Sequence, residues 1–186
     1  MSLVLILLTV LVAETSATRA SCYLRKHNDG RIIGTAKFYS ITGRYQNVSV
    51  DLYDSGLTDG LHGFHIHEQG VTGCDCLTTG GHYNPDGVNH GGAGGAASSR
   101  HVGDFGNVES RQGRIRTKLT YIVNSNKQGE GVYNVSEDRF EVRGDRSVVG
   151  RAVVLHAGTD DLGLGGDEGS RKTGNAGSRW ACCTLQ

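Results

Sequence analysis

Three of the chain's eight histidines lie within one short segment, His62-Gly63-Phe64-His65-Ile66-His67. Side chains alternate between the two faces of a strand, so His65 and His67 would project from the same face, with Ile66 on the other. Two imidazoles at this spacing can bind one metal ion. A single histidine is usually an ordinary polar residue, so it is the cluster that indicates metal binding.

Further potential ligands follow along the chain, in the segments GGHYNPDGVNHGG and RHVGDFGN and at the end of the run RAVVLH. They are His82, His90, His101, Asp104 and His156. Imidazoles with one carboxylate suit zinc or copper better than calcium or magnesium, which prefer oxygen ligands throughout. Seven potential ligands are too many for one tetrahedral site and are about the number that two sites need. The sequence therefore predicts two transition-metal sites.

The elements that would position these side chains are predicted to be strands. Runs that alternate, or that are rich in β-branched and aromatic residues, span 21–25, 32–40, 46–53, 61–67, 114–123, 132–135, 139–142 and 152–156. Two long stretches, 70–102 and 157–179, have little strand signal, and long loops of this kind are usually functional. The 29 glycines and the single proline also favour turns and loops over helices. We expect one all-β domain, an antiparallel sandwich or flattened barrel, with its chemistry on the two loops and the neighbouring strand ends.

The charge of the chain limits its partners. Lys plus Arg and Asp plus Glu both number 19, so the formal net charge is zero. This composition does not indicate a broad basic face, and no nucleic-acid partner is predicted. Any electrostatic function is expected to be local.

The amino-terminal end, residues 1–20, is predicted to be a signal peptide. Its apolar run is too short to cross a bilayer, which takes about 20 apolar residues, and small residues follow at Ala17 and Ala20, the two candidate cleavage sites. A short membrane-associated or disordered tail is the alternative, because no Lys or Arg precedes the apolar run. Secretion and cleavage would leave residues 21–186 as a domain without membrane contact, with N-glycosylation sequons at Asn47 and Asn134.

The five cysteines are interpreted as those of a secreted protein. They are Cys22, Cys74, Cys76, Cys182 and Cys183, and in an oxidising compartment they are expected to form disulfides. An odd number leaves at least one thiol free or bonded between chains. A thiolate zinc site is disfavoured, since neither C-D-C nor C-C has the spacing of a zinc finger.

Five segments together resemble the copper/zinc superoxide dismutase family in its secreted form: GFHIHEQG, GGHYNPDGVNHGG, RHVGDFGNV, VGRAVVLHAGTDDLGLGG and KTGNAGSRWAC. The resemblance runs from about residue 21 to residue 183. It implies an antiparallel Greek-key β-sandwich or flattened barrel of about eight strands with two long functional loops. It also implies an extracellular enzyme that converts superoxide to dioxygen and hydrogen peroxide by alternating reduction and oxidation of copper.

By position, the resemblance assigns His65, His67, His82 and His156 to copper, and His82, His90, His101 and Asp104 to zinc. His82 would then bridge the two metals, which requires the loss of both its ring protons and is favoured by two cations. The resemblance also implies that His82 delivers a proton to the product.

The resemblance implies roles for residues beyond the metal ligands. Asp160 would hydrogen-bond a copper histidine and a zinc histidine, and His62 would brace the copper strand. Arg179 would guide and bind the anionic substrate, so that Arg179 and His82 are the predicted catalytic residues.

The family's disulfide corresponds to Cys76–Cys182, with Cys22–Cys183 as a second bond and Cys74 left over. Cys74 could instead take the place of Cys76. Only four residues follow Cys182, so the homodimer contact that the family makes through this tail is left open. The alternative function is a secreted copper-binding or copper-delivery protein without turnover.

Overall fold

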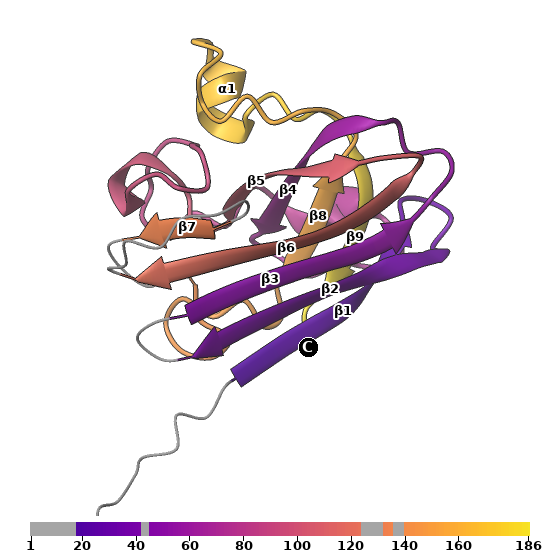
Figure 1. Cartoon of the computed structure of the whole chain (residues 1–186), viewed down its shortest axis with the longest axis horizontal. Helices are drawn as coiled ribbons and strands as arrows, with labels where there is room; N and C mark the ends of the chain where they lie inside the picture. The colour runs from indigo at the N-terminus through magenta and orange to yellow at the C-terminus, as the bar shows by residue number, and fades with distance from the viewer. Residues whose placement is uncertain (1–17, 42–44, 124–131, 136–139) are drawn as a thin grey trace, which may run out of the picture.

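The computed structural model describes residues 18–41, 45–123, 132–135 and 140–186 (Figure 1). Its strands are β1 (Thr18–Lys26), β2 (Ile32–Ile41), β3 (Tyr45–Tyr53), β4 (Gly60–His67), β5 (Asp104–Ser110), β6 (Arg114–Val123), β7 (Val132–Val135), β8 (Ala152–His156) and β9 (Arg179–Thr184). Two 3₁₀ turns, η1 (Cys76–Thr79) and η2 (Ala97–Ser99), and one short helix, α1 (Glu168–Thr173), lie between them. The expectation of an all-β fold is confirmed.

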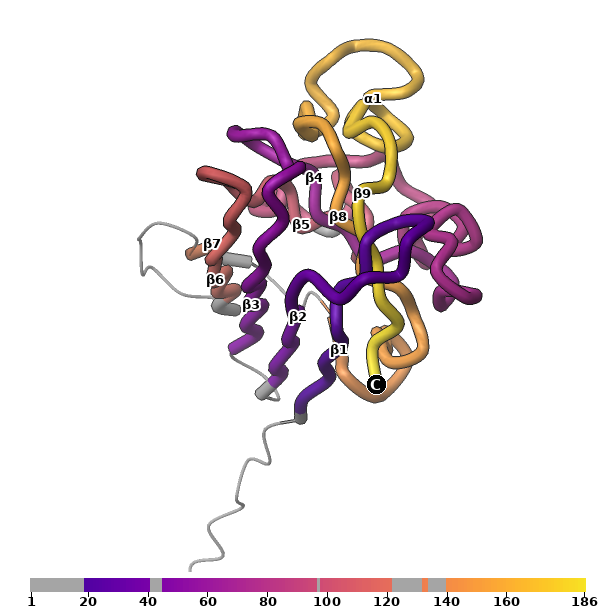
Figure 2. Tube along the Cα trace, turned by 90° about the vertical axis from the view of Figure 1, so that its right-hand side faces the viewer, coloured from indigo at the N-terminus to yellow at the C-terminus, as the bar shows by residue number. Residues whose placement is uncertain are grey.

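The strands form one sheet in the order β5-β4-β8-β9-β1-β2-β3-β6-β7. Strands distant in sequence, such as β1 and β9, are neighbours, and the sheet curls until its two halves enclose a core (Figure 2). All pairings between described strands are antiparallel except β6 with β7, which is parallel and departs from the expected pattern. In β3 the alternation of buried Val48, Val50 and Leu52 with more exposed residues places one face of the strand on this core.

Most predicted strands lie within a residue or a few residues of the observed ones. The predicted strand 139–142 is wrong for residues 140–142, where only an isolated bridge joins Glu141 to Ser147. β5 and β9 were not among the runs with strand signal. β5 contains Gly106 at a φ of 72° and begins with an acidic residue, so its sequence lacks strand signal, and tertiary pairing with β4 decides its conformation.

One disulfide ties the first long loop to the sheet, and a second joins two of its strands. Disulfides join Cys76 in η1 to Cys182 in β9, and Cys22 in β1 to Cys183 in β9. These are the two pairs that the resemblance implied, and Cys74 is a free thiol. Each bond closes a long stretch of chain and contributes about 2–4 kcal/mol.

Several expectations fall partly outside the described residues. Residues 1–17 hold most of the predicted signal peptide, and the side chain of Asn134 is also outside the description. Asn47 is half-buried in β3, and its Oδ1 accepts a hydrogen bond from Thr120. Among the described residues, no helix has the length and apolarity needed to cross a bilayer.

Candidate metal centre

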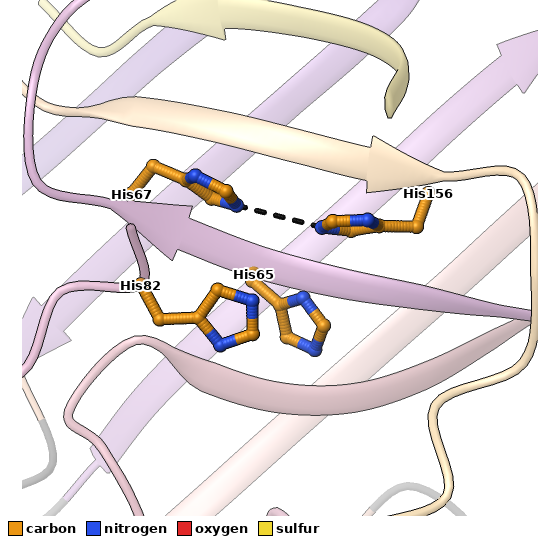
Figure 3. Close-up of side chains that lie close together, drawn as sticks. All are labelled: His65, His67, His82 and His156. Carbon is orange, nitrogen blue, oxygen red and sulfur yellow. Dashed lines mark hydrogen bonds between the residues drawn. The ribbon is translucent and has the colours of Figure 1, made fainter. Parts of the chain in front are cut away.

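Four buried imidazoles meet where β4, β8 and the first long loop adjoin (Figure 3). His65 and His67 project from the side of β4 opposite to the core residues Phe64 and Ile66, as their spacing predicts. His156 ends the neighbouring strand β8, and a bridge between His67 and His82 brings the loop alongside β4. One ring nitrogen from each of the four residues lies within 4.8 Å of the others.

The hydrogen bonds of these rings determine where their protons lie. His67 Nδ1 donates to the Gly80 carbonyl over 2.9 Å, and His156 Nδ1 donates to the Gly177 carbonyl over 3.1 Å. In neutral rings both Nε2 atoms are then acceptors, yet they face each other at 3.4 Å (Figure 3). Two lone pairs directed at one point suit a shared cation.

Further buried ring nitrogens are similarly placed. His65 Nε2 donates to Asp160 over 2.9 Å, which leaves Nδ1 as the acceptor of that ring. His65 Nδ1 and His82 Nε2 are buried without a hydrogen-bond partner among the described residues. Because buried polar atoms are almost always paired, this donor set fits a metal ion.

A second group gathers around one carboxylate oxygen. Asp104 Oδ1 lies 3.0 Å from His82 Nδ1, 2.9 Å from His90 Nδ1 and 3.1 Å from His101 Nδ1. Asp104 Oδ2 accepts the backbone N–H groups of Gly91 and His101, which fixes the carboxylate. Three imidazoles and one carboxylate are a suitable tetrahedral set for zinc.

The choice of the fourth member of this second group needs an argument. The set of atoms that all lie within 4.8 Å of one another contains His65 with His82, His90 and Asp104, and omits His101. We favour His101, because its Nδ1 lies at the same carboxylate oxygen as the other two rings. His65 falls within this set because it lies close to His82, with ring centroids 4.0 Å apart, but it belongs to the first group. His82 is thus the residue between the two groups.

Asp160 connects the two groups through the ring nitrogens that point away from the metal positions. Its Oδ2 accepts from His65 Nε2 over 2.9 Å, and its Oδ1 accepts from His90 Nε2 over 2.8 Å. Both hydrogen bonds turn the Nδ1 atoms of these rings toward the metal groups. Gly174, at a φ of 65°, packs directly against the Asp160 carboxylate, and a Cβ at position 174 would collide with Asp160 Oδ1.

The buried environment sets the charge of the rings. Burial lowers the pKa of His65 and His67 well below the usual value, helped by the nearby His82, and it lowers the pKa of His156 to about 4. Burial also opposes the protonation of His90, but hydrogen bonds to Asp104 and Asp160 raise its pKa to about 9. The first group therefore offers neutral ligands at physiological pH, whereas His90 holds a proton that a metal cation can replace.

Arg179 lies beside the first group, at the start of β9. Its Nη1 donates to the Cys76 carbonyl over 2.7 Å and to Thr79 Oγ1 over 2.9 Å, and its Nη2 donates to the Gly80 carbonyl over 2.7 Å. Gly80 also accepts from His67, so one carbonyl contacts both residues. The guanidinium charge contributes to the lowered pKa of His67 and His156, as expected of a near neighbour.

Two histidines lie outside both groups. His62 is buried between the carbonyls of His156 and Thr58, with ring nitrogens 3.0 and 2.9 Å away, so it connects β4 to the end of β8. The Nδ1 of His27 accepts the N–H of Cys76 and supports η1. No pattern in the sequence indicated this contact of His27 or the roles of Thr79 and Gly80, because the contacts join distant segments.

Comparisons with known proteins add independent findings. The family described as copper/zinc superoxide dismutase (SODC) matches residues 32–185. An extracellular superoxide dismutase [Cu-Zn] of Caenorhabditis elegans is 40% identical over 187 residues, covering 98% of this chain and 76% of that protein. Superoxide dismutase [Cu-Zn] A of Xenopus laevis is 43% identical over 136 residues, 73% of this chain and 78% of that protein. An extracellular superoxide dismutase [Cu-Zn] of Haemonchus contortus is 44% identical over 128 residues, 69% of this chain and 61% of that protein.

Proposed function

The chain belongs to the copper/zinc superoxide dismutase family and is a secreted superoxide dismutase that uses copper and zinc, and on this premise we propose the roles of its residues. His65, His67, His82 and His156 hold copper. His82, His90, His101 and Asp104 hold zinc. The observation that carries the copper assignment is the pair of Nε2 atoms of His67 and His156 that face each other at 3.4 Å.

Copper, when bound, supplies one-electron redox chemistry for superoxide, and zinc supplies a redox-inert cation. His82 is the residue positioned for proton transfer, since it contributes to both groups and its Nδ1 contacts Asp104 over 3.0 Å. Its Nε2, buried and without a hydrogen-bond partner among the described residues, is the atom that holds and donates the proton.

Arg179 binds and orients the superoxide anion. Its three hydrogen bonds to Cys76, Thr79 and Gly80 fix the guanidinium beside His67, and the side chain remains partly exposed. A fixed cation at this point raises the local concentration of a small anion and its association rate. The Cys76–Cys182 disulfide supports this arrangement, because it fixes the loop that supplies the acceptors.

Inhibition of superoxide-dependent cytochrome c reduction tests the assignment. We expect His65→Ala to lose activity and copper, whereas His27→Ala, a histidine outside both metal groups, keeps both metals. Full activity in His65→Ala would overturn the copper assignment. A fully metallated wild-type protein without activity would instead favour copper delivery.

The boundary of the mature chain is also a proposal. β1 begins at Thr18 and Ala20 is buried, so cleavage after Ala17 would preserve the whole strand. The intact mass of the secreted protein distinguishes Ala17 from Ala20 as the cleavage site.

A further inference from the structure

The turn of residues 27–31, between β1 and β2, lies against two segments that support Arg179 (Figure 2). The backbone N–H of His27 donates to the carbonyl of Trp180 over 3.0 Å, so the turn contacts β9 directly after Arg179. The next N–H of the turn donates over 3.2 Å to the carbonyl of Cys74, in the first long loop just before η1. One short turn therefore contacts both the strand that carries Arg179 and the loop that Arg179 reaches.

The His27 side chain makes a further contact with this loop. Its Nδ1 accepts the N–H of Cys76 over 3.1 Å, so the neutral ring carries its proton on Nε2. Cys76 is the first residue of η1, and the first N–H groups of a helix have no partner within the helix. The Asp75 carboxylate accepts the N–H of Leu77, which leaves that of Cys76 to an acceptor from elsewhere. His27 supplies this acceptor from 49 positions away in the sequence.

The carbonyl of the same residue holds Arg179. Cys76 accepts from Arg179 Nη1 over 2.7 Å and from Thr79 Oγ1 over 2.9 Å, and Thr79 Oγ1 also accepts from Arg179 Nη1. Hydrogen bonds from a charged donor are roughly twice as strong as neutral ones, so the direction of this carbonyl determines where the guanidinium lies. The disulfide to Cys182 fixes the sulfur of Cys76, whereas the hydrogen bond to His27 fixes its backbone.

The turn is well fixed for such a role. Lys26, the residue before it, has its Nζ 3.0 Å from the centroid of the Trp180 ring and 2.9 Å from Asp54 Oδ2. These two contacts hold the end of β1 against β9. On the other side, Gly30 packs on the loop, because a Cβ at position 30 would lie only 3.2 Å from the Cβ of Cys74. His27 therefore presents its ring from a supported position.

We propose that His27 is a positioning residue for Arg179 in the guidance of superoxide. Among the described residues, its ring contacts neither metal group nor the guanidinium, so it acts through the backbone of Cys76. The inference rests on the proposed role of Arg179 in binding the anion. With its N–H bonded to His27, Cys76 directs its carbonyl at Arg179 and holds the cation in place before each encounter, so no reorganisation is needed when the anion arrives.

The test compares His27→Ala with His27→Asn in the metal-loaded secreted protein. Alanine removes the acceptor, whereas the Oδ1 of asparagine is an acceptor close to the position of Nδ1 and restores it. We expect His27→Ala to keep both metals and to lower kcat/KM for superoxide about threefold in stopped-flow measurements, since the guanidinium remains but is less well placed. The dependence of kcat/KM on ionic strength should weaken as well. The affinity of the small anion azide, followed by the absorption of copper(II), should fall by a similar factor.

His27→Asn should restore both quantities to the wild-type level. Asn28→Gly is the matched control, because it changes the neighbouring exposed residue of the same turn, whose φ of 66° suits glycine, and keeps the acceptor. This control should also behave as the wild type does.

Exchange of the Cys76 amide hydrogen with solvent reports the hydrogen bond directly. NMR can follow it in the protein with zinc and reduced copper, which is diamagnetic. The exchange should be roughly tenfold or more faster in His27→Ala than in the wild type, because the amide loses its acceptor. It should be unchanged in His27→Asn and in Asn28→Gly.

Arg179→Gln separates this inference from the proposed function. A loss of kcat/KM in Arg179→Gln without a loss in His27→Ala would overturn the role of His27 and leave guidance by Arg179 intact. An unchanged kcat/KM in both variants would overturn the guidance itself, and the inference with it. Equal losses in His27→Ala and His27→Asn would also overturn the inference, because the effect would then come from the fold of the turn and not from the acceptor.

Discussion

Replacing Asp160 by Asn should weaken metal binding without removing any proposed ligand. The carboxylate accepts two N–H donors, from His65 Nε2 and His90 Nε2. In Asp160→Asn one acceptor oxygen becomes an NH₂ group, which is a donor. One of the two imidazoles must then lose its hydrogen bond or move its proton to Nδ1, the nitrogen directed at the metal.

The size of the effect follows from that geometry. Loss of a partner of this kind typically lowers metal affinity by about 10–100-fold. In free energy this is about 1.4–2.8 kcal/mol of binding. The loss is expected at the site whose ring faces the amide nitrogen, since the other ring keeps an acceptor oxygen.

The assay is titration of the metal-free protein with copper and with zinc against a competing chelator. ¹⁵N NMR of the imidazoles reports the tautomers directly. Asp161→Asn is the matched control, because Asp161 accepts from Ser170 and Gly163 and contacts no imidazole among the described residues. A folded Asp160→Asn protein with both metal affinities and both tautomers unchanged would refute the reasoning.

Three further predictions concern backbone, substrate guidance and pH. Gly174→Ala should destabilise the protein by about 1–3 kcal/mol in denaturant unfolding, because the added Cβ collides with Asp160. The loss should exceed that of the control Gly73→Ala, since Gly73 has a similar positive φ but open space around it, and equal losses would contradict the prediction. Arg179→Gln should lower kcat/KM by about tenfold or more in stopped-flow measurements and weaken the dependence of kcat/KM on ionic strength. The kcat/KM of Arg179→Lys should lie between those of Arg179→Gln and the wild type, and an unchanged kcat/KM in Arg179→Gln would exclude guidance by Arg179. In the metal-free protein the pKa of His156 falls from the usual 6.5 to about 4, so the unfolded state binds the proton first as pH decreases. The contribution of His156 to stability is then full above pH 6.5 and falls by about 3 kcal/mol between pH 6.5 and 4. Chemical unfolding at several pH values measures this decrease, and a flat profile between pH 6.5 and 4 would show that His156 is not buried and neutral.

Much of the candidate site could be predicted because the patterns that specify it lie in short segments of the sequence. A spacing of two residues places His65 and His67 on one face of any strand, whatever the strand pairs with. β3 and β6 were visible because burial of one face needs alternation, and β8 was visible as a continuous apolar run that is buried on both faces. β5 was not, because Gly106 and its polar residues fit a strand only when paired with β4.

Other features depend on contacts that no local pattern encodes. Arg179 reaches Thr79, and His27 reaches Cys76, only because β9 and β1 adjoin in the sheet. The positions of Asp160 behind His65 and His90 likewise require both loops to be folded.

The sequence by itself determined the chemical class of the ligands, the all-β character and the two loops, because residue types and short spacings persist in any fold. The tertiary structure decided which nitrogens face one another and which carboxylate lies behind them. Those properties depend on strand register and loop closure, which bring residues a hundred positions apart within a few ångströms.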